Sequence, residues 1–264
     1  MEKITVLSLQ KKKKEKKPIV ALTCFDAFTA QLIDDVVDIS LVGDSVANTR
    51  LGYPHTLPVT VDEMLHHVKA AGRGIHRSLL VADMPFQSYE AAPWEAAVAA
   101  GRFIKEGGAH AVKVEGGSRV AESVKAILKA NVPVMGHVGL VPQSIHLQGG
   151  YHIQGKTRDE IQAIIKDAKL LESLGVFAIV LEGIPASLGK KLTKLLKIPT
   201  IGIGAGPHCD GQILVLDDML GLTEGHAPRF VKKYAHLREV MKKAIHSYQK
   251  EVLSRRFPTL EHSY

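Results

Sequence analysis

Short apolar stretches rich in β-branched residues recur along the chain, and each leads through a polar or glycine residue into a stretch with helical periodicity. The apolar stretches lack strict alternation of apolar and polar residues, which is typical of strands buried on both faces of a parallel sheet. The predicted strands are Ile19–Thr23, Ile39–Val42, Leu79–Ala82, Ala111–Val114, Val132–Met135, Phe177–Leu181 and Thr200–Ile203. An eighth strand is predicted within Gln212–Leu216, although that segment fits a helix equally well.

The segments between the predicted strands carry helix start and stop signals. Thr60 precedes a helical pattern and has Glu63 three residues later, which is the spacing of a capping box. Pro93 stands at one predicted helix start, and Gly175 directly follows another helical pattern. The predicted helices cover Thr60–His76, Pro93–Glu106, Ser118–Ala130, Arg158–Leu174 and Pro185–Leu196, with one or two terminal helices after Pro228.

This alternation of strand and helix predicts one (β/α)₈ (TIM) barrel, an α/β fold. We expect a single domain over residues 1–264, with a short N-terminal helix and a C-terminal helical extension. The length of 264 residues fits one barrel, and no linker rich in Pro, Gly or Ser divides the chain. A doubly wound open sheet is the alternative.

Composition and charge favour a cytoplasmic enzyme. The chain is 45% hydrophobic and 23% charged, as in ordinary globular proteins, and it contains no apolar stretch of membrane-spanning length. Its two cysteines, Cys24 and Cys209, cannot form a disulfide framework. The net charge of +7 is concentrated near the chain ends. We interpret the run Lys11–Lys17 as a solvated helix face, and we expect neither a nucleic-acid nor a membrane partner.

Ionisable residues stand at or just after the ends of five successive predicted strands. Because the carboxyl ends of parallel strands meet at one rim, we expect these side chains to converge there. A single one could be a helix cap, but five in register indicate an active site. The five are Asp44, Asp83, Glu115, His137 and Glu182.

The acids at this rim suggest a hard cation. Asp44 and Asp83 could supply the two carboxylates that Mg²⁺ commonly takes, and Glu115 could be a third ligand or hold a coordinated water. Zinc fits less well, because His137 lacks paired ligands at zinc spacing. Lys113 interrupts a buried strand, so it must be paired or used, either as a Schiff base or as a fixed positive charge. The neighbouring acids favour the second role.

Two glycine-containing loops remain open to two interpretations each. The loop Ile201–Gly206 could cradle a phosphate, or its glycines could simply allow close packing. The segment Gly149–Gly155 has glycines at both ends and is either a lid over the site or an ordinary surface loop.

Taken together, these motifs resemble the ketopantoate hydroxymethyltransferase family, and the resemblance runs over nearly the whole chain. Each motif is weak alone, but the order and spacing are highly specific. The matching segments include Leu41–Ser45, Leu57–Thr60, Ala82–Phe86, Val112–Gly117, Gly136–Leu140, Pro142–Ser144, Gly149–Tyr151, Ile201–Gly206, Asp210–Leu214 and Glu261–Ser263.

The resemblance implies a (β/α)₈ barrel enzyme of pantothenate and coenzyme A biosynthesis. Such an enzyme uses Mg²⁺ and 5,10-methylenetetrahydrofolate to add a hydroxymethyl group to 3-methyl-2-oxobutanoate, giving ketopantoate. The resemblance also implies a large homo-oligomer, a decamer.

The resemblance further assigns roles to the residues at the rim. On the matching positions it makes Asp44 and Asp83 metal ligands and Glu115 a further acid of the metal site. It makes Glu182 the general base. The residues that it places around the oxoacid are Asp44, Ser45, Asp83, Lys113 and His137. Phe25 stands where many members of the family carry tyrosine, so a contact made by that hydroxyl would be lost.

Two other functions stay open on the sequence. One is a related Mg²⁺-dependent oxoacid lyase or mutase barrel of the phosphoenolpyruvate mutase and isocitrate lyase group, which dependence on folate would distinguish. The other is a phosphate- or nucleic-acid-binding protein, with steep salt dependence as its signature. The second function leaves the five ionisable strand ends unexplained.

Overall fold

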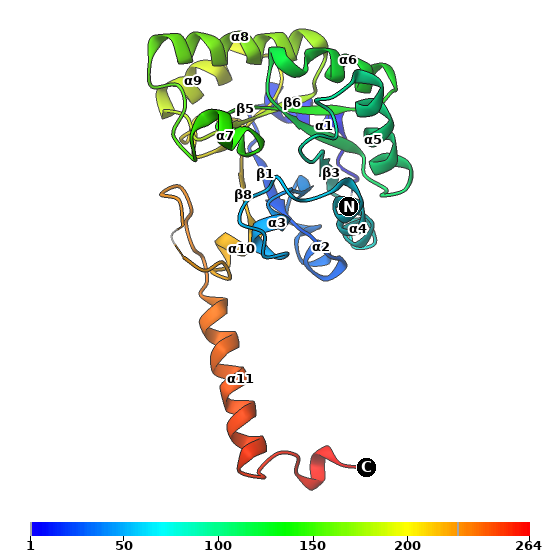
Figure 1. Cartoon of the computed structure of the whole chain (residues 1–264), viewed down its shortest axis with the longest axis vertical. Coiled ribbons are helices and arrows are strands. Elements are labelled where there is room, and N and C mark those ends of the chain that lie inside the picture. Colours follow the sequence, from blue (N-terminus) through cyan, green and yellow to red (C-terminus); the bar gives the residue numbers. More distant parts are fainter. Residues whose placement is uncertain (1, 226) are drawn as a thin grey trace. The chain divides into compact units, whose positions relative to one another are not determined.

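A computed structural model describes residues 2–225 and 227–264 of the chain, which divide into two compact units, one up to Val215 and one from Leu216. In the first unit eight parallel strands close into a barrel in the order β1 to β8, with β1 paired to β8 (Figure 1). This closure confirms the predicted (β/α)₈ barrel. It excludes the doubly wound sheet, which would leave two edges unpaired.

The strands follow the predicted pattern with two informative differences. The fifth runs on to Gly139, so that His137 lies inside it. The ambiguous segment divides into a strand that ends at Leu214 and a helix that begins at Leu216. The strands are β1 (Ile19–Thr23), β2 (Ile39–Val42), β3 (Leu79–Asp83), β4 (Ala111–Glu115), β5 (Val134–Gly139), β6 (Ala178–Glu182), β7 (Thr200–Ile203) and β8 (Gly211–Leu214).

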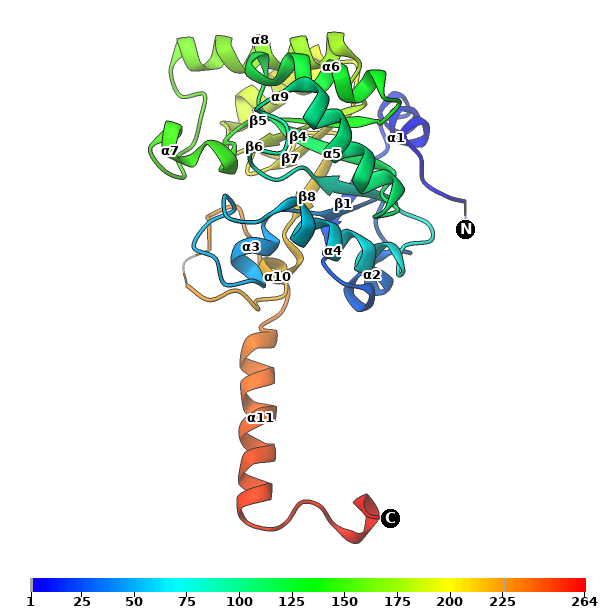
Figure 2. The same cartoon turned by 45° about the vertical axis from the view of Figure 1, so that its right-hand side comes forward.

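The predicted helix caps are present. The Thr60 side chain accepts the Glu63 backbone N–H in a capping box, and Gly175 ends another helix in the left-handed conformation with φ 104°. Helices α4, α5, α6 and α8 follow one another around the outside of the strands (Figure 2). The helices of this unit are α1 (Val6–Lys14), α2 (Ala27–Ile33), α3 (Val46–Thr49), α4 (Val61–Gly72), α5 (Pro93–Lys105), α6 (Ala121–Lys129), α7 (Ile145–Gln148), α8 (Arg158–Leu174) and α9 (Ala186–Leu195), with 3₁₀ turns at Ser118–Val120 and Pro142–Ser144.

Aliphatic side chains from alternate strand positions fill the N-terminal part of the barrel. Leu79 and Val81 of β3 belong to one buried cluster with their counterparts on the other strands. Ile4 and Leu9, from the segment before β1, belong to the same cluster, and Leu9 is completely buried. Helix α1 therefore closes the N-terminal end of the barrel.

The prediction that Lys11–Lys17 is a solvated helix face is wrong for two of its residues. Lys12 Nζ lies 2.6 Å from Asp38 Oδ1, and Lys13 Nζ lies 2.7 Å from Asp210 Oδ2. Each of these acids immediately precedes a strand, β2 or β8, so the two ion pairs fasten α1 to the barrel floor. Nothing local distinguishes these lysines from their neighbours, because their partners lie 26 and 197 residues further along the chain.

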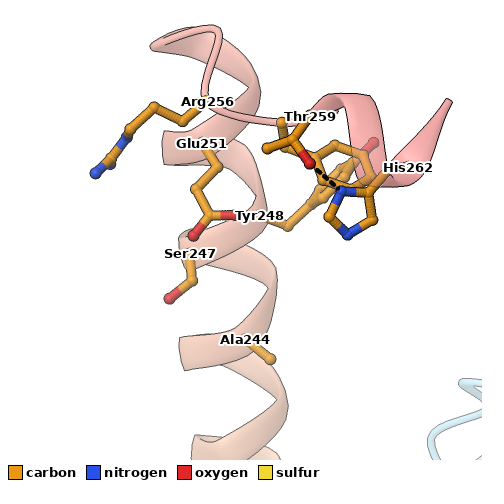
Figure 3. A pocket seen from close by; sticks show the side chains of 8 residues that line it. Ala244, Ser247, Tyr248, Glu251, Arg256, Thr259 and His262 are labelled. Atoms are coloured by element: carbon orange, nitrogen blue, oxygen red, sulfur yellow. Dashed lines mark hydrogen bonds between the residues drawn. The ribbon is translucent and has the colours of Figure 1, made fainter.

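The second unit contains α10 (Leu216–Met219), α11 (Leu237–Leu253) and a 3₁₀ turn at Leu260–His262. Of these, α11 and the turn lie after Pro228, where one or two terminal helices are expected from the sequence. The end of α11 and the following turn line a pocket to which Tyr248, Glu251 and His262 contribute (Figure 3). The Phe257 ring contacts the rings of both Tyr248 and His262. In the part of the chain that the structure describes, no helix has the length and apolar character needed to cross a bilayer.

The lysine run yields a paired test of stability. Lys13→Ala removes the ion pair to Asp210 and a hydrogen bond to the Thr193 carbonyl, so we expect the free energy of unfolding to fall by about 1.5–3 kcal/mol. Lys14→Ala alters an exposed residue of the same helix and should change it by less than about 0.5 kcal/mol. Urea denaturation measures both, and equal losses would contradict the anchoring role of α1.

Candidate active site

The alternation that fills the barrel with aliphatic residues also brings the charged residues to its interior. Along β4, Ala111, Lys113 and Glu115 share the inward face, with the aliphatic residue at the start and the charged residues toward the end. Asp83 ends β3 two residues after the core residue Val81, and Glu182 ends β6 two residues after Val180. The core therefore grades into a polar site at the carboxyl ends of the strands.

Lys113 lies at the centre of this site and is 5% exposed. Its Nζ is 3.0 Å from Asp83 Oδ1 and 3.5 Å from Glu115 Oε1. Burial alone would lower the pKa of Lys113, but the surrounding carboxylates outweigh burial and raise the pKa above its ordinary value. Lys113 is therefore a fixed ammonium, and these contacts support the charge role over a Schiff base.

The two aspartates expected to bind metal lie side by side. The Asp44 backbone N–H donates to Asp83 Oδ2 at 3.0 Å, and both residues are buried. Burial, together with the nearby Glu115 and Asp83 carboxylates, raises the pKa of Asp44 to about 8. Burial also raises the pKa of Asp83, against the opposing effect of the Lys113 ammonium. Burial thus favours the protonated form of both carboxyl groups, and a cation bound between them would favour their ionised forms.

Glu115, His137 and Glu182 form a chain across β4, β5 and β6. His137 Nδ1 lies 3.4 Å from Glu115 Oε1, and His137 Nε2 lies 3.3 Å from Glu182 Oε2. Burial would raise the pKa of Glu115, but Lys113 and His137 outweigh it and lower this pKa to about 2. Burial and Lys113 lower the pKa of His137, whereas Glu115 and Glu182 raise it more strongly, to about 9. Glu182 is the member of this chain with access to solvent, at 16% side-chain exposure.

Two further positions are Ser45, the last of the predicted site residues, and Phe25, where the chain departs from the family pattern. Ser45 is half-buried at the start of α3, next to Asp44, and its side chain makes no capping hydrogen bond to that helix. Phe25 is buried, and its backbone carbonyl lies 2.8 Å from His67 Nδ1.

The glycines of the loop after β7 have a packing role. A Cβ atom at Gly206 would lie 2.4 Å from the Ala186 Cβ, and φ at this position is 83°, in the region that favours glycine. This contact supports the close-packing interpretation of Ile201–Gly206 over a phosphate cradle.

The segment between β5 and α8 is attached to the barrel near both of its ends. The Gln148 side chain accepts the Val141 N–H at 3.4 Å, and the Gln154 N–H donates to the Gly183 carbonyl at 2.9 Å. Between these attachments Tyr151 is half-exposed, and burial together with Asp44, Glu182 and Glu115 raises its pKa. Tyr151 belongs to the segment Gly149–Tyr151 of the family resemblance, and the acids of the site disfavour its ionisation.

Two further residues of the site escaped sequence reasoning. Gln143 is buried and donates from Nε2 to Asp44 Oδ2 at 2.9 Å. Tyr89 is buried and donates from its hydroxyl to Gln143 Oε1 at 2.5 Å. The segment Pro142–Ser144 was part of the family resemblance, but neither side chain carries a charge that would single it out.

The donor set fits Mg²⁺ but does not make a closed metal cage. Within residues 2–225 and 227–264, no three His, Cys, Asp or Glu side chains are grouped as a ready metal site. Mg²⁺ needs only one or two protein carboxylates, because water and substrate oxygens complete its coordination. Asp83 Oδ1 is buried against the Lys113 ammonium at 3.0 Å, whereas Asp44 Oδ2 accepts a hydrogen bond from the neutral Gln143 amide, so a cation would add a positive charge beside the two aspartates.

Comparison with known proteins is consistent with this arrangement. Residues 3–260 match the sequence profile described as ketopantoate hydroxymethyltransferase. A 3-methyl-2-oxobutanoate hydroxymethyltransferase from Thermoanaerobacter sp. strain X514 is 52% identical over 264 residues, covering 100% of this chain and 96% of that protein.

Solved structures share the fold at low sequence identity. A phosphonopyruvate hydrolase in complex with oxalate and Mg²⁺ aligns with a TM-score of 0.64 at 11% identity, covering 98% of this chain and 93% of that one. A 2,3-dimethylmalate lyase of the PEP mutase/isocitrate lyase superfamily aligns with a TM-score of 0.62 at 12% identity, covering 93% and 88%.

Proposed function

Because this chain belongs to the ketopantoate hydroxymethyltransferase family, we propose that it transfers a hydroxymethyl group from 5,10-methylenetetrahydrofolate to 3-methyl-2-oxobutanoate, giving ketopantoate in pantothenate and coenzyme A biosynthesis. One structural observation carries the mechanism: a buried ammonium among carboxylates is connected through His137 to a partly exposed glutamate at the carboxyl ends of the strands. This arrangement suits the removal of a proton next to a keto group, followed by stabilisation of the resulting negative charge.

Asp44 and Asp83 would hold Mg²⁺, and Glu115 would be a further acid of that site, directly or through water. When bound, the ion supplies Lewis-acid stabilisation of charge on the keto acid. Ser45, Lys113 and His137 would line the keto-acid site. Lys113 is already held in place by Asp83 and Glu115, so it needs no rearrangement to offset the substrate's negative charge.

Glu182 would act as the base. It would take the C3 proton of 3-methyl-2-oxobutanoate, and the electrons of the broken C–H bond would form the enolate. C3 would then bond to the methylene carbon of the folate as one of that carbon's two bonds to nitrogen breaks. Water would supply the hydroxyl group as the second carbon–nitrogen bond breaks. The two freed nitrogens would take up the proton from C3 and a proton from water, and tetrahydrofolate would leave. His137 Nε2, at 3.3 Å from Glu182 Oε2, would orient the base.

The oxoacid lyase or mutase alternative keeps support from the shared fold alone, because the alignment to the dimethylmalate lyase is at 12% identity. It shares enolate chemistry but needs no folate. Product analysis with and without methylenetetrahydrofolate therefore separates the two functions.

We expect Asp44→Ala and Asp83→Ala each to weaken Mg²⁺ binding by more than about tenfold and to nearly abolish turnover, because one protein carboxylate is too few. Glu115→Gln should weaken binding less if this acid acts through water. Isothermal titration calorimetry with Mg²⁺ measures the affinities, and Asp62→Ala, at an exposed aspartate of α4, is the control. Unchanged affinity in both site variants would move the metal site elsewhere.

The base can be tested in isolation from the transfer step. With Mg²⁺ in D₂O and no folate, the parent protein should exchange the C3 hydrogen of 3-methyl-2-oxobutanoate for deuterium. Glu182→Gln should slow both exchange and turnover by about 10²–10⁴-fold, because it keeps the shape of the side chain but removes the proton acceptor. NMR of the C3 signal reads exchange, and Glu239→Gln, at an exposed position on α11, is the control.

Other outcomes of this experiment reassign the steps. Parental exchange by Glu182→Gln without ketopantoate formation would place Glu182 in the folate step and make His137 the leading base. No exchange by the parent protein would mean that the enolate forms only after folate binds.

The partners we propose are the two small-molecule substrates and further copies of the same chain, and we place the reaction in the cytoplasm. Along α11 the side chains of Val240, Met241, Ile245 and Tyr248 are 54–62% exposed. Met241, Ile245 and Tyr248 follow helical spacing, so they form one apolar stripe that another copy would cover. The family resemblance points to a decamer.

This association has a matched pair of tests on one helix. Ile245→Glu places a charge in the apolar stripe and should lower the mass measured by sedimentation toward that of the 28.7 kDa monomer. Lys243→Glu, on the opposite face of α11, should leave the assembly intact. A monomeric parent protein, or equal effects of the two changes, would contradict self-association through this stripe.

A further inference from the structure

We propose that Gln143 and Tyr89 are positioning residues that hold the carboxylates of Asp44 and Glu115 in the arrangement that binds the divalent cation. This inference rests on the proposed function and extends it to two residues outside the metal, substrate and base positions. Both side chains are uncharged and buried, with Gln143 5% and Tyr89 1% exposed.

Gln143 connects two strands of the site with its side chain and its backbone. Its Nε2 donates to Asp44 Oδ2 at 2.9 Å, beyond the end of β2. Its backbone N–H donates to Glu115 Oε2 at 3.0 Å, at the end of β4. One residue from the turn after β5 thus sets the separation of two acids that come from other strands.

The orientation of the Gln143 amide is determined by its neighbours. The second hydrogen on Nε2 is donated to the Met84 carbonyl at 2.9 Å, and a carbonyl oxygen can only accept. The amide nitrogen must therefore face Asp44 and Met84, and the amide oxygen must face the Tyr89 hydroxyl. A flipped amide would place an oxygen against two acceptors.

Tyr89 completes the network from the other side. Its hydroxyl donates to Gln143 Oε1 and accepts the Glu115 backbone N–H at 3.3 Å. The same hydroxyl therefore fixes both the amide and the end of β4. Because all these donors are neutral, they satisfy carboxylate oxygens without adding a positive charge that would compete with the cation.

The test uses substitutions that keep volume. Tyr89→Phe removes only the hydroxyl, and Gln143→Met keeps the length of the side chain but removes its donors and acceptor. Calorimetric titration with Mg²⁺, without substrates, should show a Kd about 10–100-fold higher for Gln143→Met and about 3–10-fold higher for Tyr89→Phe. Tyr53→Phe is the matched control, since its hydroxyl donates at 2.7 Å to Glu63, a capping residue of α4, and it should leave the Kd unchanged.

A second readout separates positioning from general loss of structure. In Tyr89→Phe the rate of C3 deuterium exchange should return to within a few-fold of the parent rate at saturating Mg²⁺, because the cation can restore the arrangement that the hydroxyl maintained. A general loss of structure would lower the thermal midpoint and would persist at saturating Mg²⁺. If Gln143→Met does not fold, the comparison of Tyr89→Phe with Tyr53→Phe decides alone.

Parental Mg²⁺ affinity in the Tyr89 variant and in a folded Gln143 variant would overturn the proposal, and so would exchange that stays low at saturating Mg²⁺. Failure of the proposed function has a different signature, which is the absence of ketopantoate from reactions of the parent protein. Weaker Mg²⁺ binding by the variants would support the positioning role even in that case.

Discussion

The organisation of the site depends on the ion pairs that the buried Lys113 ammonium forms with Asp83 and Glu115. Asp44, Asp83 and Glu115 are each no more than 5% exposed, and carboxylates removed from water to this extent tend to take up protons unless a positive charge is close. Lys113 supplies that charge within 3.0 Å of Asp83 and 3.5 Å of Glu115. It allows several acids to share a small volume at the carboxyl ends of the strands.

The two ends of the barrel handle buried charge in different ways. At the N-terminal end, Lys12 and Lys13 pair with acids that precede strands, and the apolar side of α1 covers the core. In each pair the acid neutralises the lysine, and the pair stabilises the fold. At the other end, Glu182 keeps access to solvent and lies 3.3 Å from His137 Nε2. This division agrees with the general separation of stability and chemistry in barrels of this type.

Neutral hydrogen-bond donors complete the polar end. The Asp44 backbone, the Gln143 amide and the Tyr89 hydroxyl link the segments after β2, β3, β4 and β5 without changing the net charge of the site. Such links hold strand ends that are remote in sequence at fixed positions relative to one another. They also explain why a fold shared with lyases at 12% identity need not share chemistry, because the strand-end residues and their supports determine the reaction.

The sequence alone determined the elements and the residues that carry charge to the rim. A strand such as Leu79–Ala82 is a local run of apolar residues, and a cap such as Thr60 with Glu63 is a local hydrogen bond. Both can therefore be predicted from the residues of one segment, without knowledge of the segments that pack against it. The position of an acid after a parallel strand is local as well, which is why Asp83 and Glu182 were identified.

The tertiary structure decided which polar residues have partners. In the sequence Lys12 and Lys13 do not differ from the neighbouring lysines, and their role follows only from the ion pairs with Asp38 and Asp210. Nothing in the sequence distinguishes the Gln143 amide either, and its role follows from the hydrogen bonds with Asp44 and Tyr89. The segment Gln212–Leu216 fits a strand or a helix by its sequence. Its first part forms a strand in the structure because it pairs with both β7 and β1. A hydrogen bond or ion pair between distant segments depends on where the backbone places both groups, and no local pattern of one segment contains that information.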